Sequence, residues 1–136
     1  MGSDVTLEVQ AGPSTATPEQ VLESIVRGIN SGDLDSLMPL YESEAAFATQ
    51  PGSLAHGSSG VRDALAGFIS MNGKLDIEVT RVLEVDDLAL VTGVWSFNGT
   101  GADGEPVRLA ASNADVLRRQ TDGTWCFVID NPWGTD

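Results

Sequence analysis

The chain has 136 residues and a formal net charge of −13, which comes from 20 acidic and only 7 basic residues. This balance argues against a nucleic-acid or anionic-membrane partner, because binding to phosphate groups needs clustered lysine and arginine side chains. Hydrophobic residues make up 41% of the chain, which is enough for the core of one domain of common size. The single cysteine, Cys126, excludes a disulfide within the chain.

The sequence has no run of about 18 apolar residues of the kind that spans a membrane. Its N-terminus also lacks the basic and then apolar segments of a signal peptide, so we expect a cytoplasmic protein. Residues 11–17 are rich in proline, serine and threonine. We therefore predict a flexible segment at 1–16 and a single domain at 17–136.

The first predicted helix begins after Thr17, a residue type that is favoured at the N-cap. Pro18 then suits the first helical position, and Gln20 completes a capping box with Thr17. Apolar residues follow with the spacing of one helix face. These residues are Val21, Leu22, Ile25, Val26 and Ile29. Ser31-Gly32 is predicted to end the helix.

A second, shorter helix is predicted to start after Asp33. Its apolar residues are Leu34, Leu37, Met38 and Tyr41. Pro39 suits only the first turn of such a helix, or a kink, because proline has no amide hydrogen. Residues 45–49 are predicted to form a short strand after this helix.

A loop is predicted at residues 51–59, and a third helix follows it. The expected N-cap of this helix is Ser58 or Ser59, and the expected end lies at residues 71–73. One side of the helix is apolar. The residues on that side are Val61, Leu65, Phe68 and Ile69.

The second half of the chain consists of four long segments rich in β-formers. They span residues 75–85, 88–97, 107–119 and 125–131, and the turn pairs between them are Asp86-Asp87, Asp103-Gly104 and Asp122-Gly123. Asp-Gly between such segments is a strong hairpin signal. The predicted fold class is therefore α+β, with three N-terminal helices packed on one face of a curved antiparallel sheet.

Two-residue turns centred on these pairs would fix the register of the sheet. One row across the strands would then contain Arg81, Thr92, Asp115 and Asp130. Val94, Asn113 and Val128 would share their face, since side chains alternate along a strand. The opposite face would carry Trp95, Phe97, Trp125 and Phe127. No helix remains to cover that aromatic face, so we predict a homodimer formed through it.

Asp115 and Asp130 would be cross-strand neighbours, with Cβ atoms about 5 Å apart. Two buried carboxyls at that distance repel, so one of them keeps its proton above its usual pKa. A protonated carboxyl donates a hydrogen bond to a carbonyl or enolate oxygen, which is an acid/base device. Alternatively, Arg81 neutralises the pair and the network is structural, or Asp130 is simply part of a polar strand exit.

Other candidates are weaker. His56 is the only histidine and could act as a base, although such a residue also serves to brace a loop. The Tyr41 hydroxyl could reach the pocket, or the ring could anchor the core. The sequence shows no metal-ligand cluster and no phosphate-binding loop, so neither a metal nor a cofactor is predicted.

Two segments of the sequence carry a family resemblance. They read INSGDLDSLMPLYESEAAF and NADVLRRQTDGTWCFVIDNPWG. With a glycine before a helix between them, the pattern resembles the nuclear-transport-factor-2-like superfamily over residues 18–134. The ketosteroid-isomerase-like and SnoaL-like branches, which include domains of unknown function, are the most similar. The resemblance implies a cystatin-like cone with a pocket at its open end and frequent dimers through the sheet.

Ketosteroid isomerases use an aspartate base, a tyrosine and a protonated aspartate. Asp115 matches the position of the protonated aspartate in this resemblance. Gln50 stands where the base is expected, and Ile25 stands where the tyrosine is expected. Gln50 would line the pocket without acting as a base, so we do not expect steroid isomerisation by that mechanism.

The leading hypothesis is a small-molecule-binding cone protein, which as an enzyme would be an acid/base isomerase, cyclase or dehydratase. Its substrate would be apolar and carbonyl-bearing, like a polyketide or terpenoid, with Asp115 as proton donor, Asp130 as its partner, and His56 and Tyr41 as accessory groups. The alternatives are a non-catalytic dimeric ligand-binding or accessory module, and a protein-interaction domain that uses the aromatic face. A cavity of about 300 Å³ or more beside Asp115 would favour ligand binding. Filling of that space would favour a structural module. The residues expected to fill it are Phe47, Leu65, Phe68 and Met71.

Overall fold

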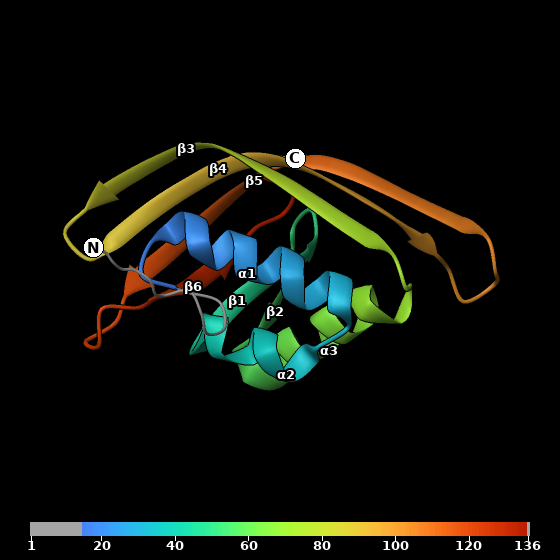
Figure 1. Ribbon diagram of the computed structural model, residues 1–136, viewed down its shortest axis with the longest axis horizontal. Coiled ribbons are helices and arrows are strands. Elements are labelled where there is room, and N and C mark those ends of the chain that lie inside the picture. The colour runs from blue at the N-terminus through green and yellow to red at the C-terminus, as the bar shows by residue number, and fades with distance from the viewer. Residues whose placement is uncertain (1–14, 136) are drawn as a thin grey trace, which may run out of the picture.

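The computed structural model describes residues 15–135, in which helices cover one face of a curved sheet (Figure 1). The helices are α1 (Pro18–Ser31), α2 (Leu34–Leu37), the 3-10 helix η2 (Met38–Leu40) and α3 (Gly57–Ser70). The strands are β1 (Tyr41–Gln50), β2 (Ser53–His56), β3 (Lys74–Val85), β4 (Leu88–Thr100), β5 (Pro106–Arg119) and β6 (Trp125–Asp130). The predicted α+β class, with three helices ahead of a four-stranded meander, is confirmed.

The first helix begins as predicted. Residues 1–14 of the segment predicted to be flexible lie outside the described part of the chain, while the Thr15 carbonyl accepts a hydrogen bond of 2.9 Å from the Trp125 amide. The Thr17 hydroxyl accepts from the Gln20 amide at 3.2 Å, and Oε1 of Gln20 accepts from the Thr17 amide at 3.2 Å. This reciprocal pair is the predicted capping box, which satisfies amides that have no partner inside the helix.

The second helix is shorter than predicted. It ends at Leu37, and three residues of 3-10 helix follow. Pro39 explains the change, because proline lacks an amide hydrogen and its ring clashes inside an α-helix. Tyr41, which was expected at the helix end, begins β1 instead and is only 7% exposed.

Two paired strands occupy the region predicted as a short strand and a loop. β1 spans ten residues instead of the five at 45–49, and β2 pairs with it in antiparallel fashion. The turn between them contains Gly52, which has a φ of 80°. Helix α3 then follows His56, whose extended backbone is the N-cap. Ser58 and Ser59 therefore lie in the first turn of the helix and are not its caps.

The six strands form one sheet in the order β2-β1-β6-β5-β4-β3. Every neighbouring pair is antiparallel except β1 and β6, which are parallel. This parallel pair joins the N-terminal hairpin to the predicted meander, and it places the start of β1 beside β6. The sheet curves around α1, which lies against β3 (Figure 1).

The loops of the two central hairpins are longer than the predicted two-residue turns. Backbone hydrogen bonds of 2.8 and 2.7 Å close the loops at 101–105 and 120–124. Each loop contains a glycine with positive φ, Gly104 at 83° and Gly123 at 88°. A glycine in this conformation is typical of three-residue hairpin loops, which change the register by one residue.

The one-residue shift in the register between β4 and β5 moves each side chain of β4 to the opposite face from the one predicted. Asp115 pairs with Val91, whereas the predicted register paired it with Thr92. Thr92 does pair with Arg81, as predicted. As a result, Thr92 and Arg81 face away from the helices, and Trp95 shares the inner face with Asp115.

A bulge in β6 restores the predicted relation between Asp115 and Asp130. Val116 pairs with Ile129 and Leu117 pairs with Phe127, so Val128 is an extra residue in β6 without a partner in β5. Both aspartates consequently lie on the inner face, where Asp115 is 1% exposed and Asp130 is 9% exposed. Their predicted placement between the sheet and the helices is confirmed.

The prediction that four aromatic side chains form an uncovered face is wrong. Trp95, Phe97, Trp125 and Phe127 are 7%, 0%, 3% and 1% exposed in the single chain. They belong to the hydrophobic core together with residues of α1 and α3. The register change in β4 and the bulge in β6 turn these rings inward.

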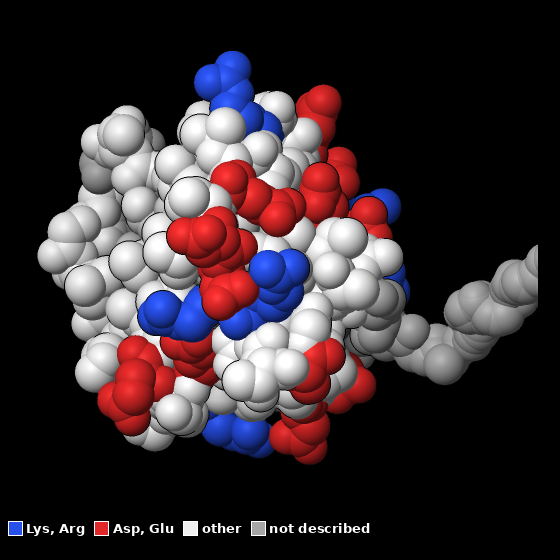
Figure 2. Space-filling view, turned by 90° about the vertical axis from the view of Figure 1, so that its left-hand side faces the viewer, with Lys and Arg blue, Asp and Glu red and all other residues white. Residues whose placement is uncertain are grey.

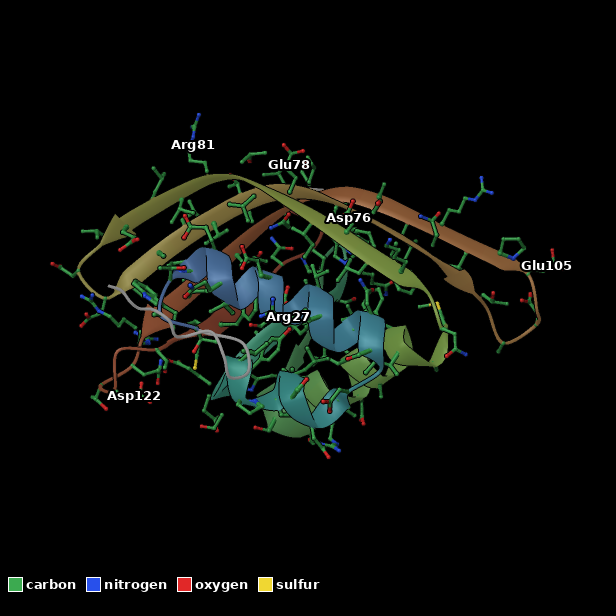
Figure 3. All side chains as sticks on the ribbon, in the orientation of Figure 1. Arg27, Asp76, Glu78, Arg81, Glu105 and Asp122 are labelled. Atoms are coloured by element: carbon green, nitrogen blue, oxygen red, sulfur yellow. The ribbon has the colours of Figure 1, made fainter. Side chains whose placement is uncertain are left out.

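The outer face of the sheet carries a different apolar surface. Leu83 pairs with Leu90, Leu90 pairs with Val116, and Val116 pairs with Ile129, so an apolar row crosses four strands. Leu83, Leu90 and Ile129 are 55%, 40% and 39% exposed. Figure 3 shows Arg81 and Glu78 projecting from the same side of the sheet, away from the helices.

Charged side chains of both signs lie together at the end of the molecule that carries the β3–β4 and β5–β6 turns (Figure 2). Two ion pairs contribute to this surface, Arg118 with Glu42 at 2.9 Å and Arg119 with Asp87 at 3.0 Å. Residues 15–135 contain no helix with the length and apolar character needed to span a membrane.

Candidate functional site

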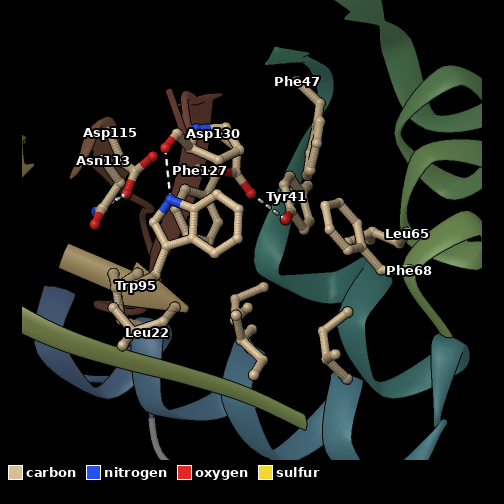
Figure 4. A pocket seen from close by; sticks show the side chains of 15 residues that line it. Leu22, Tyr41, Phe47, Leu65, Phe68, Trp95, Asn113, Asp115, Phe127 and Asp130 are labelled. Atoms are coloured by element: carbon tan, nitrogen blue, oxygen red, sulfur yellow. Dashed lines mark hydrogen bonds between the residues drawn. The ribbon is translucent and has the colours of Figure 1, made fainter. Parts of the chain in front are cut away.

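A small, partly open cavity lies between the inner face of the sheet and the helices (Figure 4). Its volume is about 60 Å³. Most of its wall is apolar or aromatic, and its polar groups come from a few residues of β1, β5 and β6. The lining residues are Leu22, Ile25, Ile29, Tyr41, Phe47, Leu65, Phe68, Leu75, Ile77, Trp95, Asn113, Asp115, Phe127, Asp130 and Pro132.

The polar residues of the cavity are placed by strand geometry. Asn113 and Asp115 are two residues apart on β5, so their side chains point to the same face. Asp130 is the last residue of β6, and the bulge before it directs its side chain inward. Tyr41 begins β1 beside β6, and its ring stacks on Phe127 with centroids 4.9 Å apart. These polar groups therefore gather at one end of an apolar cavity.

Each carboxyl has defined hydrogen-bond partners. The Tyr41 hydroxyl donates to Oδ2 of Asp130 at 2.5 Å. Asp115 accepts at both oxygens, from the Asn131 backbone amide to Oδ1 at 2.7 Å and from Nδ2 of Asn113 to Oδ2 at 2.8 Å. Figure 4 shows the two carboxyl groups next to each other, between Asn113 and Tyr41. Both carboxyls are therefore oriented by hydrogen bonds and almost fully buried.

Burial raises the pKa values of all three acids at this site. The pKa of Asp115 is well above its usual value because of burial and then because of the charge of Asp130, although the bonds from Asn131 and Asn113 oppose this. Burial raises the pKa of Asp130 to about 6, against hydrogen bonds from Tyr41 and Asp115 that lower it. The pKa of Tyr41 is also raised, by burial and by the charge of Asp130. Asp115 therefore keeps its proton at a higher pH than an isolated aspartate does, and Asp130, with a pKa of about 6, ionises beside it.

No cationic side chain balances the remaining negative charge. Among the described residues that line the cavity there is no lysine, arginine or histidine. Arg81, which could have neutralised the pair, projects from the outer face instead (Figure 3). A structural network of Arg81 with the two aspartates is therefore excluded.

Asn113 adds an unpaired acceptor to the cavity. Its side chain is 5% exposed, and Nδ2 is occupied by Asp115. Within residues 15–135, Oδ1 has no hydrogen-bond partner. A buried acceptor without a partner costs about 1–3 kcal/mol, and such groups often mark a place for a bound molecule.

The residues after β6 hold one wall of the cavity in place. Nε1 of Trp95 donates to the Pro132 carbonyl at 2.6 Å, and Nε1 of Trp133 donates to the Ala48 carbonyl at 3.1 Å. The two indole rings meet edge to face with centroids 5.4 Å apart. The Asn131 amide of the same segment donates to Asp115, so the segment fixes both the wall and the acid.

The structure brings together four of the ten residues predicted for the site: Asp115, Asp130, Tyr41 and Asn113. His56 lies at the end of β2 with its side chain 67% exposed and 3.9 Å from Glu44, so it is not part of the cavity. Gln50 is exposed and bonds to Ser53 at 3.4 Å. The others lie away from the cavity because of the register change and the bulge. They are Arg81, Thr92, Val94 and Val128.

The sequence did not indicate Trp95 and Phe127 as cavity residues, because the predicted register put them on the opposite face. Side-chain alternation along the strands places these two rings on the inner face only if the extra residue in the loop at 101–105 and the bulge at Val128 are already known. Three further lining residues that were not predicted for the site lie on the predicted apolar stripe of the first helix. They are Leu22, Ile25 and Ile29.

The described part of the chain contains no cluster of side chains suited to a metal ion. Cys126 is buried, and burial and nearby acidic groups raise the pKa of its thiol. A protonated, buried thiol is a poor nucleophile. The chemistry available at the cavity is therefore that of the two carboxyls and the tyrosine.

The sequence model of the SnoaL-like domain matches residues 22–128. The chain belongs to the SnoaL-like domain family. This match runs from within α1 to Val128 in β6, so it includes Tyr41, Asn113 and Asp115 and ends two residues before Asp130. The family lies within the NTF2-like superfamily, as the resemblance predicted. Among curated proteins, none has a sequence that matches this chain.

Solved structures share the fold at low sequence identity. A ketosteroid isomerase-like protein from Erwinia carotovora atroseptica SCRI1043 is 17% identical, with a TM-score of 0.73 over 85% of this chain and 92% of that one. A candidate dehydratase of the NTF2-like family from Streptomyces avermitilis is 16% identical, with a TM-score of 0.69 over 83% and 90%. An NTF2-like protein with a cystatin-like fold from Novosphingobium aromaticivorans is 15% identical, with a TM-score of 0.68 over 82% and 75%. This SnoaL-like protein therefore shares the cystatin-like fold with these proteins.

Proposed function

We propose that this SnoaL-like protein is an acid/base enzyme that forms an enol or enolate from a small carbonyl compound. The observation that carries the proposal is the pair of buried carboxyls, both with raised pKa values, at the polar end of an apolar cavity. An ionised carboxylate and a protonated carboxyl side by side supply a base and an acid at the same pH.

In the proposed reaction Asp130 is the base and Asp115 is the acid. Asp130, ionised above about pH 6, removes a proton from the carbon next to the carbonyl. The electron pair of that C–H bond forms the C=C bond of the enol, and the π pair of the carbonyl moves onto its oxygen, where the Asp115 carboxyl donates its proton or a hydrogen bond. Returning the proton from Asp130 to another carbon gives an isomer. If the substrate instead carries a β-hydroxyl, that group leaves and takes the proton as water.

The size of the cavity limits what can enter it. At about 60 Å³ it is smaller than the 300 Å³ expected for a complete polyketide- or terpenoid-sized ligand. The enclosed part accepts the carbonyl end of a substrate, and a larger body would extend past the partly exposed lining residues. These are Phe68, Leu75, Ile77 and Pro132.

The alternative function is a non-catalytic ligand-binding or accessory module. The small cavity favours it, because Phe47, Leu65 and Phe68 line the space and Met71 packs against the same core. A filled structural module would, however, gain nothing from two buried carboxyls without a cation, since removing such charges often stabilises a protein. Because the two buried carboxyls have no neutralising cation, we favour the enzyme over the non-catalytic module.

The test needs no knowledge of the natural substrate. Small ketones such as acetone and cyclopentanone are incubated with the protein in D₂O, and exchange of their α-protons is followed by proton NMR. We expect exchange at least about tenfold faster than in buffer, and loss of the excess in Asp130→Asn and Asp115→Asn. Glu78→Gln, which removes one negative charge from the outer face, is the matched control. Equal exchange in the wild-type protein and in Asp130→Asn would refute the proposal.

We also propose that two copies of the chain pair through the outer face of the sheet. The apolar row from Leu83 to Ile129 crosses four strands and is exposed, and large exposed apolar surfaces on a sheet commonly mark such contacts. Light scattering should give a mass of about twice the 14.3 kDa of one chain, and the Ile129→Lys variant should have the mass of a single chain. A single-chain mass for the wild-type protein at micromolar concentration would contradict the dimer.

A further inference from the structure

The candidate site has an excess of negative charge and of hydrogen-bond acceptors, and this excess points to a ligand. We propose that the cavity binds a small protonated amine, whose ammonium group lies against the Asp130 carboxylate at the polar end of the cavity and whose apolar body lies against the aromatic walls. The proposal uses the same cavity as the proposed enzyme, but it does not depend on catalysis.

The first support is the count of donors and acceptors. Oδ1 of Asn113 is buried and has no partner among residues 15–135. Asp130 accepts from Tyr41 at Oδ2, and a carboxylate has about four lone-pair sites, so further acceptor positions remain. The amide of Asn113 and the hydroxyl of Tyr41 already donate to the two carboxyls. A ligand that supplies several N–H donors would satisfy what the protein leaves unpaired.

The second support is charge. The described lining residues include no lysine, arginine or histidine, so the ionised carboxylate has no counter-charge. A buried charge without a partner is strongly unfavourable, and a cationic ligand would remove that penalty. The net charge of −13 would also raise the local concentration of cations and lower that of anions.

The third support is the nature of the walls. Tyr41, Phe47, Phe68, Trp95 and Phe127 contribute aromatic rings to the cavity. The negative faces of such rings attract an ammonium group, and their area suits an apolar body. The indole N–H of Trp95 is occupied by the Pro132 carbonyl, so this ring offers the cavity its carbon surface and not a donor.

The test compares ligands of nearly equal shape and different charge. Isobutylamine, isobutanol and isobutyrate are small enough for a confined head-group site, and binding is followed by the NMR shift of the Trp95 indole proton. At pH 8 we expect isobutylamine to bind at least tenfold more tightly than isobutanol, and isobutyrate not to bind. Equal or tighter binding of isobutyrate, or no binding of isobutylamine, would overturn the proposal.

Variants locate the ammonium group. Asp130→Asn should weaken isobutylamine at least tenfold and leave isobutanol within twofold, whereas Glu78→Gln should change neither. Asn113→Leu removes the unpaired acceptor and should also lower the affinity for isobutylamine. An amine affinity that is unchanged in Asp130→Asn would overturn the proposal.

The pH dependence gives a test that needs no variant. The titratable groups facing the site are Tyr41 from β1, Asp115 from β5 and Asp130 from β6, while α1 and α3 contribute only apolar side chains. Because the pKa of Asp130 is about 6, lowering the pH from 8 to 5 should weaken the amine about tenfold and leave the alcohol unchanged. Amine binding that is independent of pH would contradict the inference. Ketone exchange can fail while amine binding persists, or the reverse, so the two proposals fail separately.

Discussion

Three carboxylates outside the cavity have arginine partners, whereas the two carboxylates inside it have none among the described residues that line it. Asp35, Glu42 and Asp87 lie 3.0, 2.9 and 3.0 Å from arginine nitrogens. Asp115 and Asp130, which are buried, have none among the described residues that line the cavity. These three carboxylates, which are in contact with water, are paired, and the two whose burial is unfavourable are not. Buried acids kept in this state are typical of functional sites.

Hydrogen bonds nevertheless orient the two buried carboxyls. Tyr41, Asn113 and the Asn131 amide each donate a hydrogen bond to it. These neutral donors orient the carboxyls without cancelling their charge. An arginine would have lowered both pKa values and removed the proton on which the proposed acid catalysis depends. The comparison therefore predicts different responses to mutation at the two kinds of carboxylate.

The largest effect is expected at Asp130. Its folded-state pKa, about 6, is above the ordinary value of 3.8, so the folded protein binds the proton more tightly and loses stability as the pH rises through this interval. At about 1.4 kcal/mol for each tenfold change in proton affinity, the penalty at pH 7 is roughly 3 kcal/mol. Asp130→Asn should therefore raise the free energy of unfolding by about 1–3 kcal/mol at pH 7.5 and by much less at pH 4.

Urea denaturation at the two pH values measures this difference. Glu78→Gln serves as the control, and we expect it to change stability by less than about 0.5 kcal/mol at both. If Asp130→Asn instead destabilised the protein by several kcal/mol at pH 7.5, the carboxylate would be a structural group and the contrast with the surface would disappear.

A smaller effect is expected at Trp133, which tethers the segment after β6. Trp133→Ala removes the contact with the Trp95 ring and the bond to the Ala48 carbonyl, so stability should fall by about 1–2 kcal/mol. The Asn131 bond lowers the pKa of Asp115, and loosening it should raise that pKa further. Trp133→Phe, which keeps a ring, should show a smaller loss. An unchanged Asp115 titration in Trp133→Ala would show that the segment does not position the acid.

The smallest effect is expected at a surface pair. Asp35 and Arg62 are 3.0 Å apart, with side chains that are 86% and 49% exposed. Asp35→Asn should reduce stability by less than about 0.5 kcal/mol, and the difference should shrink in high salt. Thermal denaturation at low and high salt checks this. A loss above about 1 kcal/mol would mean that surface carboxylates matter more than the comparison allows.

Local sequence signals predicted much of the fold. Thr17 and Gln20 gave the start of α1, because a capping box involves only neighbouring residues. The fold class and the four-stranded meander followed from alternating apolar segments and Asp-Gly pairs. Asp115 and Asp130 were correctly placed together on the inner face. For β5 and β6, a longer loop and the bulge at Val128 compensate each other, so the simple register still gave the right result.

The rest of the site depends on features that no local pattern reveals. The loop closed by residues 101 and 105 shifts β4 by one residue, and nothing later in the hairpin corrects it. That single residue sends Val94 outward and Trp95 into the cavity. Loop length and bulge position are selected by packing across the whole sheet, so they cannot be inferred from one strand. For this reason the carboxyl pair was predictable and its aromatic surroundings were not.

The most direct test of the central claim is the titration of the two carboxyls themselves. Carbon-13 NMR of the aspartate side chains, assigned with Asp115→Asn and Asp130→Asn, follows the carboxyl signals from pH 3 to 9. We predict that the pair loses one proton near pH 6, that Asp115 stays protonated above that pH, and that each variant shifts the titration of the other residue. Complete ionisation of both carboxyls below pH 5 would contradict a shared proton in the cavity, and with it the acid/base role.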